Sequence, residues 1–355
     1  MPRTTRQIML GQVAVGGGAP VSVQTMAKAD PAHVDTIVEQ FLMAKRAGCD
    51  IGRIAVPDEA AVESIPEIRE RTGLPIVADV HFNHRLAVAA AEIGADGLRV
   101  NPGNLGGPKN LAAVVEAAAK AGVPIRVGVN AGSMPKLDGE AMEATAENMV
   151  SVALEQAKAI EAMGYQAIKV SLKASEIHSM VAACRLFVER SNLPLHLGLT
   201  EAGPMLSGSV RSAAALSLLL AEGIGETIRV SLAAPPAEEV RVARTLLIAL
   251  GLRSGPVVVA CPTCGRTKAE VMLVAERVER SLEGDARDLT VAVMGCEVNG
   301  PGEARASDLG LAFGSGGTGL LFEKGQVVAK LPNGQLEQAL MEKIFQRALE
   351  DSDGA

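Results

Sequence analysis

Three cysteines and one glutamate near the C-terminus have the residue types and spacing of a redox metal centre. Cys261 and Cys264 form a Cys-Pro-Thr-Cys-Gly motif, and Cys296 opens the segment Cys-Glu-Val-Asn-Gly-Pro-Gly-Glu303. Each motif directly follows a short apolar run, so a strand would deliver the thiols and nearby backbone N–H groups toward one point. Three soft thiolates with one hard oxygen ligand suit an iron–sulfur cluster in which one iron stays exchangeable and can bind a substrate.

Two other readings of the cysteines stay open. A structural zinc site usually takes a second C-x2-C about 12–20 residues on, but only Cys296 follows Cys264, after 31 residues, and no histidine follows His196. A C-x-x-C can also be a thioredoxin-like redox pair, which would leave Cys296 without a role. The local pattern favours the iron–sulfur cluster. Cys49 and Cys184 are interpreted as small buried hydrophobic residues.

The composition limits the classes of protein to which the chain can belong. A chain of 355 residues with 48% hydrophobic content can fold as one large domain and a smaller one. No apolar run reaches the ~18 residues of a membrane span, and we expect no signal peptide. Five cysteines, an odd number, argue against a secreted disulfide scaffold, so we expect a cytoplasmic protein. The net charge of −7, the single tyrosine and the absence of tryptophan give no reason to expect nucleic acid as a partner.

Eight short β-branched or apolar runs recur along the first 232 residues, most of them followed by a helix-like segment. Strands separated by helices imply parallel pairing with right-handed crossovers, and eight such units fit a (β/α)8 TIM barrel. An open doubly wound sheet is the alternative, but it would usually carry a first-turn dinucleotide loop, which is missing. The expected strands are 21–26, 51–56, 75–81, 97–101, 124–130, 167–173, 194–201 and 227–232.

The barrel is expected to span residues 1–250, and a smaller α/β cluster domain residues 256–355. A hairpin within 7–15 could close the bottom of the barrel. The Gly-rich run 314–319 lacks the Lys-Ser/Thr ending of a phosphate loop, so we interpret it as a turn. The other expected elements are helices at 141–162, 237–250, 267–282 and 336–350, and strands at 289–294, 309–313 and 319–331.

Polar side chains gather at the C-terminal ends of the expected barrel strands, where TIM barrels place their active sites. Even spacing within each strand puts them on one face, and only Glu201 breaks this parity, so we expect it in the loop beyond its strand. They are Arg53, Asp79, His81, Arg99, Asn101, Arg126, Asn130, Lys169, Ser171, Lys173, His196, Thr200, Glu201, Arg229 and Ser231.

The charge of these strand ends indicates the kind of ligand. Any one inward arginine could belong to a buried ion pair. Four arginines and two lysines from five strands, with few acids among them, instead require an anionic partner. Arginine forks fit phosphate oxygens, and a basic pocket inside an acidic protein focuses a small anion and not a polymer.

Taken in order, these motifs resemble the 4-hydroxy-3-methylbut-2-en-1-yl diphosphate synthase family, the iron–sulfur enzymes of the methylerythritol phosphate route to isoprenoids. The resemblance runs from about residue 6 to about residue 346 and is closest to the shorter bacterial type. The segment after Val-Gln-Thr-Met26 departs from the family pattern, so no substrate role is assigned there. The motifs are Val-Ala-Asp79-Val-His81-Phe, Leu-Arg99-Val-Asn101-Pro-Gly, Ile-Arg126-Val-Gly-Val-Asn130, Ile-Lys169-Val-Ser171-Leu-Lys173, His196-Leu-Gly-Leu-Thr200-Glu201, Ile-Arg229-Val-Ser231-Leu and the cysteine segments.

The resemblance implies reductive ring opening of 2-C-methyl-D-erythritol 2,4-cyclodiphosphate, with two electrons delivered singly through a [4Fe–4S] cluster. It implies that Glu201 donates a proton, that Asp79 and His81 position nearby groups, and that flavodoxin or ferredoxin supplies electrons. The implied cluster ligands are Cys261, Cys264, Cys296 and a labile Glu303. The implied substrate ligands are Arg53, Arg99, Asn101, Arg126, Asn130, Lys169, Arg229 and Ser231.

The stretch Gly-Leu-Arg-Ser-Gly-Pro at 251–256 is expected to be the linker between the two domains, and its length also predicts an assembly. After its eighth helix a barrel chain is back at the N-terminal face, opposite the active site, and about six residues span at most ~20 Å. We therefore expect a homodimer in which the cluster of one subunit caps the barrel of the other. The rival functions are a redox-silent barrel synthase with a zinc-stabilised tail, and a cluster-bearing sensor, which would have no need of a phosphate pocket.

Overall fold

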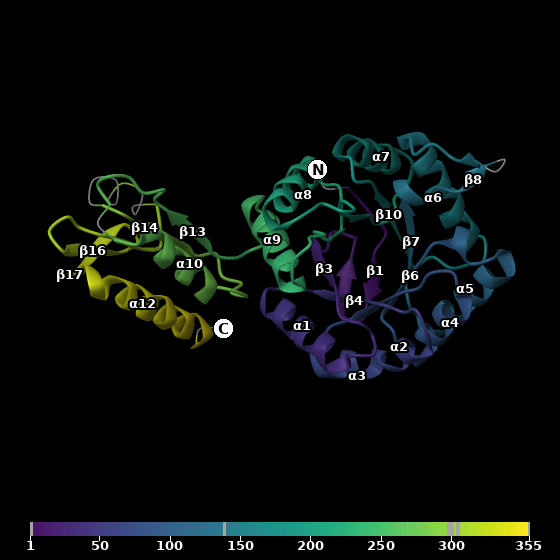
Figure 1. Ribbon diagram of the computed structural model, residues 1–355, viewed down its shortest axis with the longest axis horizontal. Coiled ribbons are helices and arrows are strands. Elements are labelled where there is room, and N and C mark those ends of the chain that lie inside the picture. Colours follow the sequence, from purple (N-terminus) through teal and green to yellow (C-terminus); the bar gives the residue numbers. More distant parts are fainter. Residues whose placement is uncertain (1–2, 138–139, 268, 297–301, 303–305, 354–355) are drawn as a thin grey trace. The chain divides into compact units, whose positions relative to one another are not determined.

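The computed structural model describes the chain except for residues 1–2, 138–139, 268, 297–301, 303–305 and 354–355. The chain folds as two compact units, Met1–Arg253 and Ser254–Ala355. In the first unit the strands lie at the centre and the helices surround them (Figure 1). No helix in the described part of the chain is long and apolar enough to cross a membrane.

Eight parallel strands form the sheet of the first unit, in the order β10-β7-β6-β5-β4-β3-β12-β11. A single bridge between Val170 and Leu195 connects the two ends of this order, so the sheet curls into a barrel. The predicted TIM-barrel fold is confirmed, with all eight strands in the predicted places. The strands are β3 (Ser22–Met26), β4 (Ile51–Ala55), β5 (Ile76–Asp79), β6 (Gly97–Val100), β7 (Ile125–Asn130), β10 (Ile168–Lys173), β11 (His196–Leu197) and β12 (Thr227–Ile228).

Strands β11 and β12 are only two residues long, shorter than the runs that predicted them. Gly198, with φ +157°, ends β11 at a close approach of two backbones. A Cβ atom there would lie 2.3 Å from the carbonyl oxygen of Arg229, so only glycine fits. This close approach brings the loop that follows β11 against the end of β12.

The helices follow the strands, and several of them begin at a side-chain cap. Thr145 accepts a hydrogen bond from the Asn148 N–H at 3.2 Å, so α6 begins at Ala146. The predicted start at 141 was wrong, because Glu140–Ala141 pairs as β9 with β8 (Lys136–Leu137). The helices are α1 (Val34–Arg46), α2 (Glu59–Glu63), α3 (Ile65–Thr72), α4 (His84–Ile93), α5 (Pro108–Ala121), α6 (Ala146–Glu161), α7 (Ile177–Arg190), α8 (Met205–Leu220) and α9 (Pro236–Ala249), with short 3-10 turns at Pro102–Asn104 and Ala131–Ser133.

An N-terminal hairpin packs against the starts of the barrel strands. Strands β1 (Ile8–Leu10) and β2 (Val13–Val15) pair antiparallel, and their apolar side chains contact Ile51 and Val77. Gly97 makes room for them, since a Cβ there would lie 2.4 Å from a Leu10 methyl group. Apolar packing therefore fills the N-terminal end of the barrel, and polar chemistry is left to the other end.

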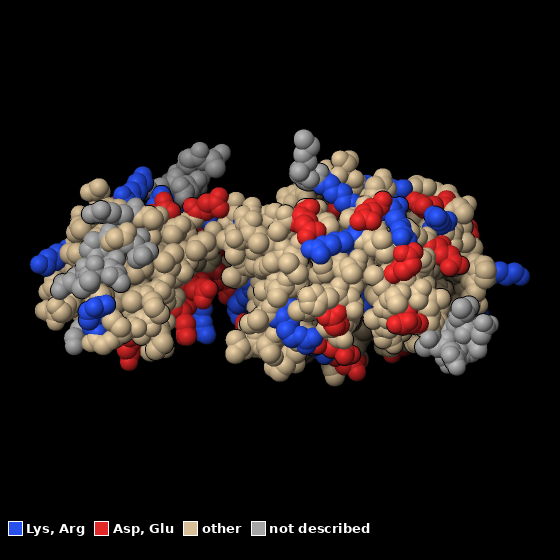
Figure 2. Space-filling model, turned by 90° about the horizontal axis from the view of Figure 1, so that it is seen from above, with Lys and Arg blue, Asp and Glu red and all other residues tan. Residues whose placement is uncertain are grey.

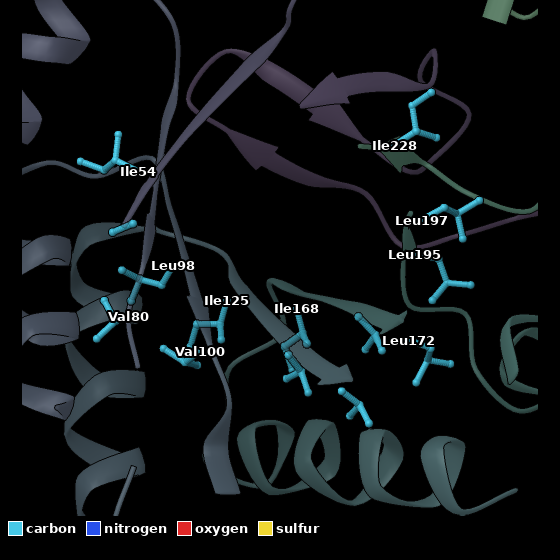
Figure 3. Packing of buried hydrophobic residues seen from close by; sticks show 14 of the residues in the cluster. Ile54, Val80, Leu98, Val100, Ile125, Ile168, Leu172, Leu195, Leu197 and Ile228 are labelled. Atoms are coloured by element: carbon cyan, nitrogen blue, oxygen red, sulfur yellow. The ribbon is translucent and has the colours of Figure 1, made fainter. Parts of the chain in front are cut away.

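Alternation along the strands separates an apolar face from a polar one. Leu98, Val100 and Ile125 belong to the buried cluster that the strands form with the surrounding helices (Figure 3). Arg99 lies between Leu98 and Val100, and Arg126 follows Ile125 on the next strand. Both side chains must therefore point to the opposite face, which is the barrel interior. The interior is thus lined by the polar residues of the strands.

The second unit is a five-stranded sheet in the order β13-β14-β15-β16-β17, with the first three strands parallel. The predicted strand 319–331 is a hairpin, because Lys324 and Gly325, with φ of 49° and 75°, form a tight two-residue turn. The helix predicted from 267 begins at Val271. The elements are β13 (Val257–Ala260), α10 (Val271–Ser281), β14 (Thr290–Met294), β15 (Leu309–Ala312), β16 (Thr318–Glu323), β17 (Gln326–Pro332) and α12 (Asn333–Asp353).

Candidate active site

A row of charged side chains crosses the inside of the barrel. The strand register aligns Lys169 of β10 with Arg126 of β7, Arg126 with Arg99 of β6, and Arg99 with Asp79 of β5. None of the four is more than 7% exposed. By contrast, the outer surface drawn in Figure 2 carries cations and carboxylates interspersed. The row is the part of the predicted site that neighbouring strands assemble directly.

Asp79 organises the acidic end of this row. Its Oδ1 accepts a hydrogen bond from Arg99 Nη1 at 3.2 Å, and its Oδ2 lies 4.0 Å from Arg53 Nε. His81 Nε2 lies 3.6 Å from the same carboxylate and 2.5 Å from Arg99 Nη1. Burial alone would raise the pKa of Asp79, but Arg53, the hydrogen bond from His81 and Arg99 together hold that pKa well below its usual range. Asp79 is therefore a permanent carboxylate that fixes two arginines.

The other end of the row holds buried donors without acceptors. Within the described residues, Lys169 Nζ, Arg126 Nε and Gln24 Nε2 are buried and have no hydrogen-bond partner. Burial and the neighbouring arginines lower the pKa values of Lys169 and Lys173 well below that of a free lysine. Arg126 Nη1 donates to Gln24 Oε1 at 3.3 Å. Burying such donors without a hydrogen-bond partner costs free energy of folding, so their arrangement favours an anionic ligand.

Arg229, at the end of β12, completes the basic lining and has an acidic partner that the sequence reasoning missed. Its Nε lies 3.4 Å from Glu239 Oε2 in the first turn of α9. The sequence does contain a sign of this partner, because Glu239 lies on the same helix face as the buried Ala243 and Leu246. A carboxylate on an apolar helix face needs a buried partner. Gln24 and the buried Lys173 were likewise left out of the predicted substrate ligands.

The remaining predicted site residues lie on loops at the same end of the barrel. Asn101 caps a 3-10 turn by accepting from the Gly103 N–H at 3.1 Å. Asn130 ends β7, and Ser231 follows β12; both are half-buried. Glu201 is exposed in the loop beyond β11, as its parity predicted, and has a left-handed backbone with φ +53°. Non-glycine residues rarely adopt this conformation, and strained positions cluster at functional sites.

His196 lies in the interior beneath these loops. It is completely buried, and neither ring nitrogen has a hydrogen-bond partner among the described residues. Burial, together with Arg126 and Lys173, lowers its pKa well below the ordinary histidine value, so the ring stays neutral. Its surroundings are those of the basic row, and a neutral ring there adds no further positive charge.

The three cysteines follow the C-terminal ends of two neighbouring strands of the second sheet, β13 and β14. Cys261 directly follows β13, and its N–H donates to the Val293 carbonyl of β14 at 3.0 Å. Cys296 comes two residues after β14, which is parallel to β13, and Cys264 lies in the turn that β13 enters. Glu303 lies outside the described residues. Among the residues that the structure describes, no three His, Cys, Asp or Glu side chains come together as ligands of one metal ion.

The chemistry of the Cys264 loop nevertheless fits a thiolate-bound group. The backbone N–H of Arg266 donates to the thiol and lowers the pKa of the exposed Cys264, although desolvation opposes the effect. The loop is held in shape by the Cys264 N–H, which donates to Thr267 Oγ1 at 3.1 Å. Backbone N–H groups directed at a sulfur stabilise the thiolate form, which is the form that ligates metals.

Two family profiles match the sequence. One is described as the GcpE TIM-barrel domain and covers residues 5–244; the other is the GcpE protein C-terminal domain and covers residues 257–346. The chain belongs to the GcpE family. A GcpE relative from Geobacter sulfurreducens is 49% identical over 97% of this chain and 98% of its own length, and is named 4-hydroxy-3-methylbut-2-en-1-yl diphosphate synthase (flavodoxin). A relative of the same name from Caldanaerobacter subterraneus subsp. tengcongensis is 44% identical over 99% of both chains. The predicted family resemblance is confirmed.

Solved structures add information on the fold of this GcpE chain. The dihydropteroate synthase of Yersinia pestis matches with a TM-score of 0.50 and 15% identity, covering 69% of this chain and 97% of that one. A type I 3-dehydroquinate dehydratase from Clostridium difficile matches with a TM-score of 0.51 and 15% identity, covering 70% and 98%. At this identity the likeness extends to the barrel fold alone.

Proposed function

We propose that this chain catalyses the reductive ring opening of 2-C-methyl-D-erythritol 2,4-cyclodiphosphate to 4-hydroxy-3-methylbut-2-enyl diphosphate. The observation that carries the proposal is the buried basic row of a GcpE-family barrel, whose unpartnered donors call for a compact, highly charged anion. The names of the GcpE relatives give the product and the electron carrier, and the cyclodiphosphate substrate is part of the proposal. Overall, the substrate takes up two electrons and two protons, its ring C–O bond to phosphate breaks, and one water is released.

The basic row binds and orients the diphosphate. Arg53, Arg99 and Arg229 offer planar forks to phosphate oxygens, while Arg126 and Lys169 supply donors from deeper in the barrel. Because Asp79 already fixes Arg53 and Arg99, little side-chain freedom is lost when the ligand binds. Loop residues complete the set of contacts to the substrate. They are Asn101, Asn130 and Ser231.

Proton delivery falls to residues above the row. Glu201 is exposed in a strained loop at the mouth of the barrel, where a carboxyl group can reach the leaving hydroxyl. His81, next to Arg99 and Asp79, orients the substrate on the opposite side of the mouth. In this scheme Asp79 transfers no proton, because its pKa keeps it ionised throughout the working pH range.

Cys261, Cys264 and Cys296, with Glu303, would hold a [4Fe–4S] cluster. Bound there, such a cluster would supply electrons one at a time to the substrate. Single-electron delivery calls for a one-electron carrier, and the names of the relatives specify flavodoxin.

The test is turnover of the cyclodiphosphate by anaerobically purified protein with reduced flavodoxin. We expect product only when the donor is present, and at least about a hundredfold less from Arg126→Met, since a charged group in contact with the transition state contributes about 3 kcal/mol. Arg185→Met is the matched control, because Arg185 pairs with Glu222 on the outer surface. Substrate consumption without an electron donor would replace the proposal with the redox-silent synthase.

The homodimer is part of the proposal. Arg253, the last residue of the barrel unit, donates to the Val21 carbonyl at 3.1 Å and pairs with Asp50 at 3.1 Å. Both partners directly precede barrel strands, so the chain leaves the barrel at its N-terminal end, away from the basic row. A short linker from that end supports a site that is shared between two subunits.

Subunit mixing tests the shared site. Glu201→Gln would inactivate the barrel of its own chain, and Cys296→Ala would inactivate the cluster domain of its own chain. In a mixed dimer with shared sites, the intact barrel of one subunit meets the intact cluster of the other, so we expect activity to return from two inactive proteins. If mixed dimers form and stay inactive, each site lies within one chain.

A further inference from the structure

Glu239 is a buried carboxylate that the proposed mechanism leaves without a role. It lies in the first turn of α9 and is 1% exposed. A carboxylate so deeply buried is stable only with charged and hydrogen-bonding partners. Among the described residues Glu239 has four such partners, and they come from two different strand ends.

Two of these partners connect the loops across the seam between β12 and β3. The two strands pair over only two residues each, ending at Ile228 and Val23. Beyond that point Thr25 Oγ1 donates to Glu239 Oε2 at 2.9 Å, and the Leu232 N–H donates to Oε1 at 3.0 Å. The carboxylate thus replaces the missing strand hydrogen bonds where the barrel opens toward its active site.

The other two partners are cations at the mouth of the barrel. Lys28 Nζ lies 3.0 Å from Glu239 Oε1 and also donates to the Leu232 carbonyl at 2.6 Å. Arg229 lies against the carboxylate through Nε and Nη2, each 3.4 Å from an oxygen. Among the described residues, Glu239 is therefore the group that fixes the direction of the Arg229 guanidinium.

We propose that Glu239 is a positioning residue that holds Arg229 in place for the substrate diphosphate. The inference rests on the proposed function, since it assigns Arg229 to anion binding. Two other roles would have different consequences. A carboxylate that only seals the barrel seam would affect folding and not the affinity of the folded protein. A carboxylate that acts mainly through its own charge would repel the anion, so its removal would tighten binding.

The experiment is titration calorimetry of the full-length protein with inorganic pyrophosphate. The variants are Glu239→Gln, Arg229→Gln and the double substitution, with Glu238→Gln as the matched control because Glu238 pairs with Arg241 in the same helical turn. We expect Glu239→Gln to weaken binding by roughly tenfold or more, as the loss of a charged hydrogen bond does. The double variant should bind no more weakly than Arg229→Gln alone, because Glu239 acts through Arg229.

Each possible outcome has a distinct meaning. Wild-type affinity or tighter binding in Glu239→Gln would overturn the inference, as would strictly additive losses in the double variant. A reduced number of sites with unchanged affinity would assign Glu239 to folding alone, which also overturns it. If Glu239→Gln does not fold, Glu239→Asp keeps the charge with a shorter reach and should still weaken binding. No binding by the wild-type protein would refute the anion site itself and not the role of Glu239.

Discussion

Replacing Lys169 by methionine should stabilise the ligand-free protein while it destroys ligand binding. Lys169 is 1% exposed, and its Nζ has no hydrogen-bond partner among the described residues. Leaving such a group unsatisfied costs about 1–3 kcal/mol. Methionine has a similar length and no donor, so Lys169→Met should raise the free energy of unfolding by about that amount.

The assay is thermal unfolding with and without pyrophosphate. For a domain of this size, 1 kcal/mol shifts Tm by about 2–4 °C, so we expect a rise of about 2–12 °C in the free protein. Pyrophosphate should raise the Tm of the wild type by mass action and leave the variant almost unchanged. Lys158→Met is the control, since Lys158 is exposed on the outside of α6 and should show no shift of either kind.

The stabilisation expected from Lys169→Met should depend on pH. The pKa of Lys169 is lowered by burial and by Arg126, so between that pKa and the unfolded value of about 10.4 the unfolded chain binds more protons. The stability of the wild type therefore rises with pH across this window. The advantage of Lys169→Met should be greatest at low pH and shrink as pH approaches the unfolded value. A variant that is less stable than the wild type at neutral pH would refute the reasoning, because Lys169 would then have a stabilising partner.

Three further predictions address other groups. Asp79→Asn should lower the free energy of unfolding by about 3–5 kcal/mol, because it leaves buried arginines unpaired; a loss below 1 kcal/mol in denaturant titrations would contradict the ion-pair geometry. The pKa of Asp79 is lower in the folded protein than in the unfolded chain, so the ion pairs of Asp79 should contribute fully to wild-type stability above the unfolded pKa. That contribution should be lost as pH falls through the folded pKa. Glu201→Gln should reduce turnover by about a hundredfold or more with unchanged pyrophosphate affinity, and a parallel loss of affinity would assign Glu201 to binding. Pyrophosphate binding should be accompanied by proton uptake on Lys169 and Lys173, whose pKa values are lowered in the free protein, so the affinity should fall as pH rises. Calorimetry in buffers of different ionisation enthalpy measures this uptake. Proton release on binding would show that these lysines are already charged in the free protein.

The barrel could be predicted from the sequence because each of its strands is specified locally. A run such as Ile168–Lys173 alternates apolar and polar residues, and the apolar set alone decides which face packs on the helices. The same alternation predicts that Arg126 and Lys169 lie inside the barrel. Parallel register then brings these side chains into one row, so the core of the site follows from the pattern of the strands.

The parts that were missed depend on contacts between distant segments or on turn geometry. Glu239 gains its role only when α9 lies against the ends of β3 and β12, which no local pattern encodes. Gln24 is uncharged and was given no substrate role from the sequence, so its contact with Arg126 was not expected. The hairpin at Lys324 and Gly325 was predicted as one continuous strand, because apolar runs at 320–322 and 327–329 lie close to the turn on both sides.

Metal and sulfide analysis tests the central claim most directly. Anaerobically purified protein should contain about four irons and four acid-labile sulfides per chain and no zinc. Cys296→Ala should lose them, whereas Cys49→Ala should retain them, because Cys49 is a buried cysteine of the barrel with a pKa raised by burial to about 12. One zinc per chain without sulfide would contradict the redox mechanism and leave only a phosphate-binding barrel.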